Sequence, residues 1–346
     1  MKGVFMKIRL KDIAQMAHVS ETTASLVLND APSRISEAKR QEIKKIAKAH
    51  GYVPNFAARG LAMKKTNTIG LILPDITNPY FAALAKKIDD ELRKYDYLTI
   101  VVNTDDKAES ERDLIQLLLN RGADALIVIA SNESSENSEA FDKLLTATGI
   151  PVLLLDRTIA NPAYNQVSAD DELGGFLATK HLIENGHRKI ACITSMKTAN
   201  GRERLAGYRR AMQEADLPIA ADWEIDAAFK FEEGYTAAAP LVENKAVTAV
   251  FAASDLIAYG VIKQAQEAHL QIPEDLSLIG YDNLAFSKIV SISLTSIDQN
   301  IDLLGETAAD LLVKRLTDKR ASKAKQIKIK PVLIKNQSVK QITTSK

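Results

Sequence analysis

The chain has 346 residues, of which 46% are hydrophobic and 26% charged, with one cysteine, Cys192. One cysteine excludes an internal disulfide framework and favours a reducing compartment, the cytoplasm. No apolar run approaches the roughly 20 residues that span a bilayer, and no apolar stretch follows the basic segment 1–11. We therefore expect neither a membrane span nor a signal peptide.

Charge is distributed unevenly along the chain. Residues 1–66 hold 13 lysines and arginines against 5 acids, a net charge of +8, whereas residues 67–346 hold 32 against 39, a net charge of −7. A small basic segment is expected where a protein binds phosphates, so nucleic acid is a candidate partner. The alternative is a solvated helix face, which accounts for the basic residues of 39–48 better than for Arg34 or Arg59.

Two short helices are predicted in Leu10–Asn29, with a break before Ser20. Apolar residues at Ile13, Ala14 and Ala17 recur at helical spacing, and Ser20 is a good N-cap for the second helix. Small hydroxyl side chains on that second helix are typical of a helix-turn-helix, which places its second helix in the major groove of duplex DNA. Ordinary helical domains also contain such pairs, so this pattern alone leaves DNA binding open.

A third helix is predicted from Ser36, another N-cap, to His50, where Gly51 ends it. Beyond residue 66, strand-like apolar runs alternate with amphipathic helical patterns, which predicts parallel sheets covered on both faces. This part of the chain, about 280 residues, is longer than a single α/β domain usually is. We therefore expect two subdomains, with a ligand between them where the strands end. The predicted strands are Ile69–Leu73, Leu98–Val102, Ala125–Ile129, Val152–Leu155, Ile190–Ile193, Ala249–Ala252 and Leu276–Ile279, with a strand-like C-terminal stretch at Ile327–Ser338.

Motifs of the common enzyme classes are absent from the sequence. There is no G-x-G-x-x-G after a strand and no G-x-x-x-x-G-K-[ST], and the histidines lack metal-ligand spacing. Gly174-Gly175 lies in a helical pattern and indicates a close helix contact. The pairs Asp105-Asp106 and Asp170-Asp171 are interpreted as acids at helix N-termini, favoured there by the helix dipole. We expect no catalytic residue, no metal and no cofactor.

A set of motifs in fixed order resembles one known family. In the first 62 residues they are VSETTASLVLND, RIS and GYVPNFAARGLA. In the remainder they are TNTIGLILPDITNPYF, RGADALIVIA, IPVLLLDR, GHRKIACIT, RERLAGYRRAM, AVFAASDLIAYGVI, IPEDLSLIGYDN and LTSIDQN. Together they resemble the LacI/GalR family of bacterial transcriptional regulators over nearly the whole chain. Within the family, the headpiece sequence TTASLVLN followed by RIS is most similar to the fructose- and sucrose-type repressors.

The resemblance implies an α/β fold with an all-α helix-turn-helix headpiece, a hinge helix and a periplasmic-binding-protein type I core of two doubly wound parallel-sheet subdomains. The implied boundaries are a headpiece at 1–55, a hinge helix and linker at 56–66 and a core at 67–346. Within the core, the N-subdomain would hold about 67–163 and 291–325, and the C-subdomain about 164–290 and 326–346.

The same resemblance implies a set of DNA contacts. Glu21 and Thr22 open the recognition helix, where Glu21 could accept from cytosine N4 or merely favour the helix N-terminus. The family often has arginine where this chain has Leu26, and we propose that Arg34, in a longer loop, restores a phosphate or base contact. Leu61 matches the leucine that wedges into the central base step, with a core role as the alternative. The full set is Leu10, Lys11, Ser20, Glu21, Thr22, Thr23, Ser25, Asn29, Arg34, Tyr52, Asn55, Ala58, Arg59 and Leu61.

Residues that match the family's ligand cleft are Asp75, Phe81, Asp156, Arg157, Arg204, Phe229, Ser254, Asp255, Asp282 and Gln299. Carboxylates, arginine and amide can bind sugar hydroxyls, while the phenylalanines can stack on an apolar sugar face. Phe229 and Ser254 replace a tryptophan and an asparagine of the lactose repressor. These departures limit how closely the resemblance identifies the ligand. Helix capping is the alternative role for Asp255.

The predicted function is a sequence-specific DNA-binding repressor of a carbohydrate-use operon. Its partners would be pseudo-palindromic double-stranded operator DNA and a small sugar or sugar phosphate that switches operator affinity. The alternative is a regulator of the same family with a purine, nucleoside or other non-sugar effector acting as corepressor. Two-fold operators need dimers, and the C-terminus has no leucine heptads, so a cytoplasmic homodimer without membrane contact is expected.

Overall fold

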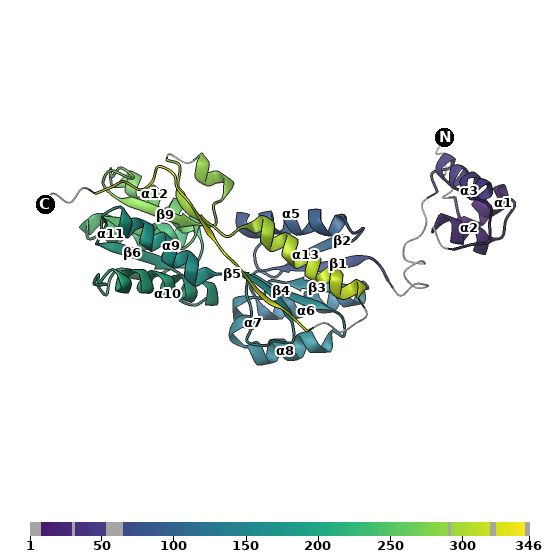
Figure 1. The fold of residues 1–346 in the computed structure, drawn as a ribbon, viewed down its shortest axis with the longest axis horizontal. Helices are drawn as coiled ribbons and strands as arrows, with labels where there is room; N and C mark the ends of the chain where they lie inside the picture. The colour runs from purple at the N-terminus through teal and green to yellow at the C-terminus, as the bar shows by residue number, and fades with distance from the viewer. Residues whose placement is uncertain (1–7, 30–31, 53–64, 290–291, 319–322, 343–346) are drawn as a thin grey trace, which may run out of the picture. The chain divides into compact units, whose positions relative to one another are not determined.

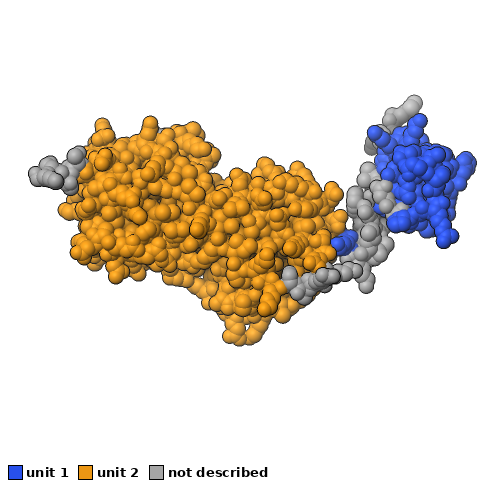
Figure 2. Space-filling view, in the orientation of Figure 1, with its two compact units in different colours: residues 1–66 blue, residues 67–346 orange. Residues whose placement is uncertain are grey.

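The computed structural model describes residues 8–29, 32–52, 65–289, 292–318 and 323–342. The chain divides into two compact units, residues 1–66 and residues 67–346 (Figure 2). Each unit has its own hydrophobic core. Every helix in these ranges is too short or too polar to cross a lipid bilayer.

The described residues of the first unit form a three-helix cluster made of α1 (Leu10–Met16), α2 (Glu21–Leu28) and α3 (Glu37–Ala49). All three predicted helices are confirmed. The hydroxyl oxygens of Ser20 and Ser36 accept from the backbone N–H of the third residue onward, as N-caps do. The core of this unit is Ile13, Ala17, Val27, Ile43 and Ala47. One face of each helix therefore holds the cluster together, and the other faces are left for partners.

The second unit begins with a six-stranded, fully parallel sheet (Figure 1). In sheet order its strands are β11 (Gln326–Ile329), β5 (Asn165–Ala169), β4 (Val152–Leu155), β3 (Ala125–Val128), β1 (Thr68–Leu73) and β2 (Leu98–Asn103). Helices α5 (Pro79–Arg93) and α13 (Ile301–Thr317) cover one face. Helices α6 (Ala108–Asn120) and α8 (Ser138–Ala147) cover the other, with the short α7 (Asn132–Glu136) beside them.

A second six-stranded sheet follows, parallel except for β12, which runs antiparallel to β10. In order its strands are β12 (Val332–Ile334), β10 (Thr295–Asp298), β9 (Ser277–Tyr281), β8 (Ala249–Ala252), β6 (Ile190–Thr194) and β7 (Glu224–Asp226). Its helices are α9 (Asp171–Glu184), α10 (Ala199–Glu214), α11 (Phe231–Asn244), α12 (Asp255–Glu267) and the 3-10 turn η1 (Ala285–Lys288). The predicted fold class, a helix-turn-helix headpiece followed by two doubly wound subdomains, is confirmed.

The chain crosses between the two sheets three times, each time later than the sequence suggested. The predicted crossings near residues 163, 290 and 325 are replaced by crossings after β5, after β10 and after β11, because β5 and β11 belong to the first sheet and β10 to the second. These strands read NQVSA, TSID and QIKI, so polar residues break the apolar runs that mark a strand. The predicted strand-like stretch Ile327–Ser338 therefore supplies both β11 and β12, one to each sheet.

The prediction of a close helix contact at Gly174-Gly175 is confirmed. A Cβ on Gly175 would lie 2.1 Å from the backbone carbonyl oxygen of Arg204, and one on Gly174 would lie 2.2 Å from the hydroxyl oxygen of Tyr281. Helix α9 can approach α10 and β9 this closely only without side chains at these two positions. This contact positions Arg204, which lines the cavity described in the next section.

Candidate functional site

The headpiece presents the start of α2 to solvent. Ser20 caps the helix by accepting from the N–H of Thr23 at 3.1 Å, and Glu21 and Thr22 directly after it are exposed. Leu26, one turn further along, is 37% exposed, which is high for a large apolar side chain. The first two turns of α2 therefore offer a carboxylate, a hydroxyl and an apolar group to a partner.

Other predicted DNA-binding residues of the headpiece differ in how available they are. Lys11 and Arg34 are exposed, whereas Leu10, Thr23 and Ser25 are half-buried. The amide of Asn29 is engaged within its own helix end, where Nδ2 donates to the carbonyl of Ser25 at 2.8 Å. Tyr52 packs partly against the headpiece core. The predicted residues Asn55, Ala58, Arg59 and Leu61 lie outside the described residues, as does most of the predicted hinge.

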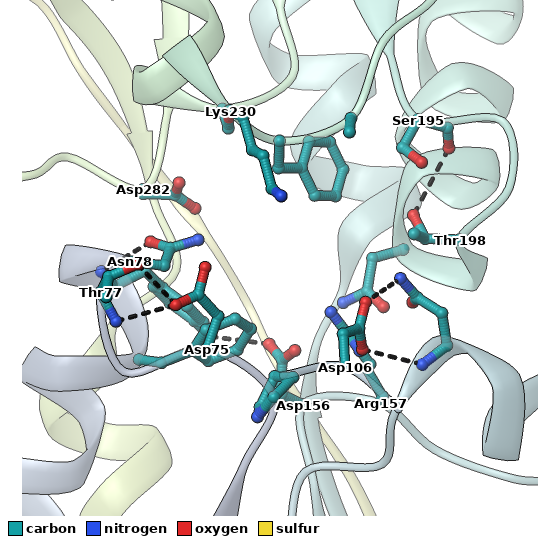
Figure 3. A pocket seen from close by; sticks show the side chains of 18 of the residues that line it. Asp75, Thr77, Asn78, Asp106, Asp156, Arg157, Ser195, Thr198, Lys230 and Asp282 are labelled. Atoms are coloured by element: carbon teal, nitrogen blue, oxygen red, sulfur yellow. Dashed lines mark hydrogen bonds and ion pairs between the residues drawn. The ribbon is translucent and has the colours of Figure 1, made fainter. Parts of the chain in front are cut away.

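The second unit contains a cavity of about 320 Å³ at the carboxyl ends of strands from both sheets (Figure 3). Parallel α/β sheets bind ligands at this edge, because strand-end loops from neighbouring strands meet there. All predicted effector residues except Asp255 line it. They are Asp75, Phe81, Asp156, Arg157, Arg204, Phe229, Ser254, Asp282 and Gln299. Residues of the lining that the sequence analysis did not predict to bind the effector include Asn78, Tyr80, Asp106, Asn132, Ser195, Thr198, Asn200 and Lys230.

Several aspartates of the lining adopt a left-handed backbone. The φ angles are 54° at Asp105, 59° at Asp106, 64° at Asp156 and 105° at Asp282, each shortly after a strand. Non-glycine residues adopt this conformation at a cost, and such strain is concentrated at ligand sites. The turns that carry these side chains are thus held in an unusual conformation at the cavity.

Arg204 is held by a fixed set of partners on one side of the cavity. Its Nε donates to Oδ1 of Asp171 at 2.7 Å and its Nη1 donates to the carbonyl of Ala253 at 2.6 Å. The guanidinium carbon lies 3.7 Å from the ring centroid of Tyr281 and 5.1 Å from that of Phe229. Burial opposes its charge, but the Asp171 carboxylate holds the pKa of Arg204 above its ordinary value. Nη2 makes no hydrogen bond to the described residues, so it remains available to a ligand.

Arg157 is fixed in a similar way on the first subdomain. Its Nη1 donates to Oδ1 of Asp106 at 2.6 Å and to the carbonyl of Ala130 at 2.9 Å. Asp106 also accepts from the backbone N–H of Asn132 at 2.9 Å, at the start of α7. Asp106 is thus an acid at a helix N-terminus, as the sequence analysis interprets it, although that helix is α7 and not α6, which begins at Ala108. The left-handed turn carries Asp106 to a different helix.

A group of hydrogen-bonding side chains, called here the hydrogen-bond chain, joins the two subdomains at Tyr80, whose single hydroxyl proton can be donated to only one acceptor at a time. The Tyr80 hydroxyl donates to Oδ1 of Asp156 at 2.8 Å and lies 3.3 Å from Oε1 of Gln299, whose Nε2 donates to Oδ1 of Asp282 at 2.6 Å. Burial raises the pKa of Asp282 well above its ordinary value. Burial also raises the pKa of Asp156, with a smaller contribution from the nearby charge of Asp171. A ligand group that donates a hydrogen bond to either carboxyl would therefore stabilise its charged form.

Asp255, for which the sequence predicts a ligand contact or a helix cap, is not among the residues that line the cavity. Its carboxylate accepts from the hydroxyl of Ser296 at 2.7 Å, from the backbone N–H of Leu284 at 2.7 Å and from the hydroxyl of Ser287. Burial raises its pKa to about 6. The cap of α12 is Ser254, which accepts from the N–H of Ile257. Asp255 instead joins α12 to the loop after β9.

The paired acids at the start of α9 have separate roles. Asp170 is the N-cap, accepting from the N–H of Leu173 at 3.1 Å, as predicted. Asp171 is 3% exposed and binds Arg204, Asn200 and Tyr281. Across the described ranges, no cluster of histidine, cysteine and acidic residues could hold a metal ion. Cys192 is free and buried.

Comparisons with known proteins decide the family. Residues 9–55 match the family model described as bacterial regulatory proteins, lacI family, and residues 179–339 match a periplasmic binding protein-like domain. The HTH-type transcriptional repressor PurR of Histophilus somni strain 129Pt is 35% identical over 333 residues, covering 96% of this chain and 98% of that protein. The chain belongs to the LacI family of bacterial transcriptional regulators.

Solved structures of this family agree with the assignment. A LacI family regulator from Enterococcus faecium with bound ribose is 33% identical, covers 80% of this chain and 100% of that chain, and superposes with a TM-score of 0.71. The lac repressor dimer bound to operator and the anti-inducer ONPF is 25% identical over 96% of this chain and 99% of that chain, with a TM-score of 0.85. This member of the LacI family is a DNA-binding transcriptional repressor and not an enzyme.

Proposed function

We propose that this repressor acts in the cytoplasm as a homodimer whose operator affinity is controlled by a small molecule in the cavity of residues 67–346. The observation that carries this proposal is the polar cavity, lined from both sheets, in a chain that also has a capped helix-turn-helix. A ligand that binds one arrangement of the subdomains better shifts the population toward it, and by linkage changes DNA affinity. Residues 1–55 would bind DNA, 56–66 would form the hinge and 67–346 would bind effector and partner subunit.

The start of α2 is proposed to read the operator. Glu21 and Thr22 are exposed at the helix end that enters the major groove. A carboxylate can accept from cytosine N4, and the exposed Leu26 suits the methyl group of thymine. Arg34, also exposed, is proposed to bind phosphate.

A sugar is the effector class that the lining of the cavity supports best. Carboxylates only accept hydrogen bonds and guanidinium groups only donate them. A hydroxyl does both, so a ligand with several hydroxyls can satisfy Asp282, Asp156 and Nη2 of Arg204 together. Phe81 and Phe229 supply apolar surface for a sugar ring. The ribose in the Enterococcus faecium neighbour supports this choice.

A purine is the second candidate, and sequence comparison supports it better. Full-length curated relatives carry the name PurR and align with 96% of this chain, whereas the ribose-bound neighbour covers 80%. The phenylalanines could stack on a purine, and Asp282 and Gln299 could bind its ring edge. Such a ligand could act as corepressor, raising operator affinity rather than lowering it.

A binding experiment separates these candidates. Full-length protein would be titrated calorimetrically with ribose, fructose, sucrose, hypoxanthine and guanine, and gel shifts on DNA upstream of its own gene would be run with each compound. One class should bind and change the DNA affinity, while the other should do neither. Analytical ultracentrifugation at micromolar protein tests the dimer, and a stable tetramer would contradict it. If an Arg157→Met variant binds the active compound as tightly as the wild type, the compound does not bind in this cavity.

A further inference from the structure

The cavity holds cations, but its acids are more numerous. The lining carries five aspartates, Asp75, Asp105, Asp106, Asp156 and Asp282, against Arg157, Arg204 and Lys230. Asp171 adds a sixth carboxylate directly behind Arg204. If Asp156 and Asp282, the two buried acids, are left out of the count, the remaining four carboxylates still exceed the three cations. The site therefore offers no net positive charge to a ligand.

Both arginines are already neutralised by carboxylates of the protein. Nη1 of Arg157 lies 2.6 Å from Oδ1 of Asp106, and Nε of Arg204 lies 2.7 Å from Oδ1 of Asp171. The Arg204 pair is almost fully buried, with both side chains 4% exposed. An anionic ligand would have to compete with carboxylates that cannot move away, because Asp171 is also bound by Asn200 and Tyr281. These arginines can donate hydrogen bonds but provide little uncompensated charge.

Three helix ends that contribute to the lining are capped by side chains, whereas α11, whose N-cap residue Lys230 also lines the cavity, has no side-chain cap among the described residues. Helix N-termini are the usual place where α/β folds bind phosphate. Here Asn78 caps α5, Thr198 caps α10 and Ser254 caps α12, each by accepting from a first-turn N–H. At α7 the N–H of Asn132 is bound by the Asp106 carboxylate, so a negative charge of the protein already lies where a phosphate would bind.

Four acids of the lining, in contrast, are held by neutral donors. Asp75 accepts from Thr77 and Asp105 from Asn103, while Tyr80 donates to Asp156 and Gln299 to Asp282. The remaining cation is Lys230, which forms no ion pair with a described residue. Its side chain points into the cavity from the side opposite Asp156 (Figure 3).

We propose that the cavity selects an uncharged effector and rejects its phosphorylated form. This inference rests on the proposed function, which places the effector here, and it narrows both candidate classes. A free sugar, or a free purine base or nucleoside, would be the signal. A sugar phosphate or a nucleotide would not, because its phosphate would meet several carboxylates and a single unpaired lysine.

Matched ligand pairs provide the first test. Calorimetric titration of the full-length protein would compare ribose with ribose 5-phosphate, fructose with fructose 6-phosphate, and inosine with inosine 5′-monophosphate. In whichever pair binds, the phosphorylated compound should bind at least about 30-fold more weakly, as expected for one net repulsive charge at this range. Equal or tighter binding of the phosphorylated compound would overturn the inference.

Inorganic phosphate provides a second test that does not depend on knowing the effector. The thermal unfolding midpoint would be measured in phosphate and in chloride of equal ionic strength, for the wild type and for Lys230→Glu. General salt effects, and any phosphate binding by the headpiece, act alike on both proteins. Equal shifts of the unfolding midpoint in the two proteins therefore support the inference. Stabilisation by phosphate of the wild type alone would show an anion site in the cavity and overturn it. If no unphosphorylated compound binds, the proposed effector classes fail, and this comparison still decides the charge selectivity.

Discussion

Arg204 and Asp171 join α10 to α9 through one buried ion pair, with Nε and Oδ1 2.7 Å apart and both side chains 4% exposed. Replacing Asp171→Asn would leave the guanidinium charge buried without its carboxylate. We expect the free energy of unfolding to fall by about 3–5 kcal/mol and effector affinity to fall with it, as measured by urea titration and calorimetry.

A surface pair on the same helix supplies the control. Arg209 binds Glu224 through two nitrogens, but its side chain is 55% exposed. Glu224→Gln should therefore cost less than about 1 kcal/mol. Similar losses for the two variants would show that burial does not set the strength of the Arg204 pair.

Gly175→Ala should damage both stability and effector binding. The added Cβ would lie 2.1 Å from the backbone carbonyl of Arg204, and backbone atoms cannot rotate away, so α9 and α10 must separate. We expect a loss of about 2 kcal/mol or more in the free energy of unfolding. Gly149→Ala is the control, because nothing lies within 4 Å of its Cβ although its φ is +67°. It should lose about 1 kcal/mol and bind effector normally. Normal effector binding by Gly175→Ala would contradict this role.

Tyr80→Phe tests the hydrogen-bond chain between the subdomains. The ring is kept while Asp156 loses the donor 2.8 Å away, so we expect effector affinity to change by up to about tenfold. Tyr164→Phe is a matched control, since that hydroxyl also donates to an aspartate, Asp142, at 2.8 Å but does not line the cavity. An unchanged dissociation constant for Tyr80→Phe would mean that the chain does not contribute to binding.

His187 should make folding weaker in acid. Its ring contacts the hydroxyl of Thr248 and the carbonyl of Lys340, and burial lowers its pKa to about 4. The unfolded chain takes up a proton below about pH 6.5, but the folded chain does so only near pH 4. Stability from this group is therefore complete above pH 6.5 and is lost as the pH falls toward 4.

We expect the wild type to lose about 2 kcal/mol more than His187→Gln between pH 7.5 and pH 5. Urea titrations at the two pH values measure this difference. Glutamine can donate and accept at the same two places, so the native contacts are largely kept. Parallel curves for wild type and His187→Gln would refute the assignment.

Glu21→Gln should change which base is read, not only how tightly DNA binds. A glutamine prefers adenine where a carboxylate accepts from cytosine N4, so selection from random DNA should show a new base at one position of each half-site. Arg34→Ala should instead weaken binding to all sequences and reduce the salt dependence by about one phosphate contact. An unchanged sequence preference in Glu21→Gln would place that side chain in solvent, as a helix-end acid.

The sequence predicted what depends on near neighbours. Ser20 and Ser36 cap helices through residues three positions away, and apolar runs such as residues 69–73 form strands wherever both faces are covered. Strands β5 and β10 carry polar residues that find partners only in the folded sheet, so their pattern gave no strand signal. These two strands were therefore not among the strands predicted from the sequence.

The site shows the same division. Asp156, Arg157 and Asp282 were found because family motifs place them directly after buried strands. Asp171 was read as a local helix acid because its partner Arg204 is 33 residues away. Asp255 had the same local pattern, an acid at a helix start, yet its carboxylate is bound by the loop after β9. Residue type and local sequence are the same for Asp171 and Asp255. Their different roles depend on partners that are distant in the sequence.

The late return of the chain to the first sheet has a consequence for synthesis. That sheet begins with Thr68, but its edge strand β11 ends at Ile329, and α13, which covers one face, is also made late. The three helices described in the headpiece, α1 to α3, which share their own core, are complete once Ala49 has been added. A growing polypeptide on the ribosome therefore completes the DNA-binding helices early, and completes the first sheet of the unit proposed to bind the effector only after Ile329. Chains cut short by premature termination would carry these helices without the completed sheet.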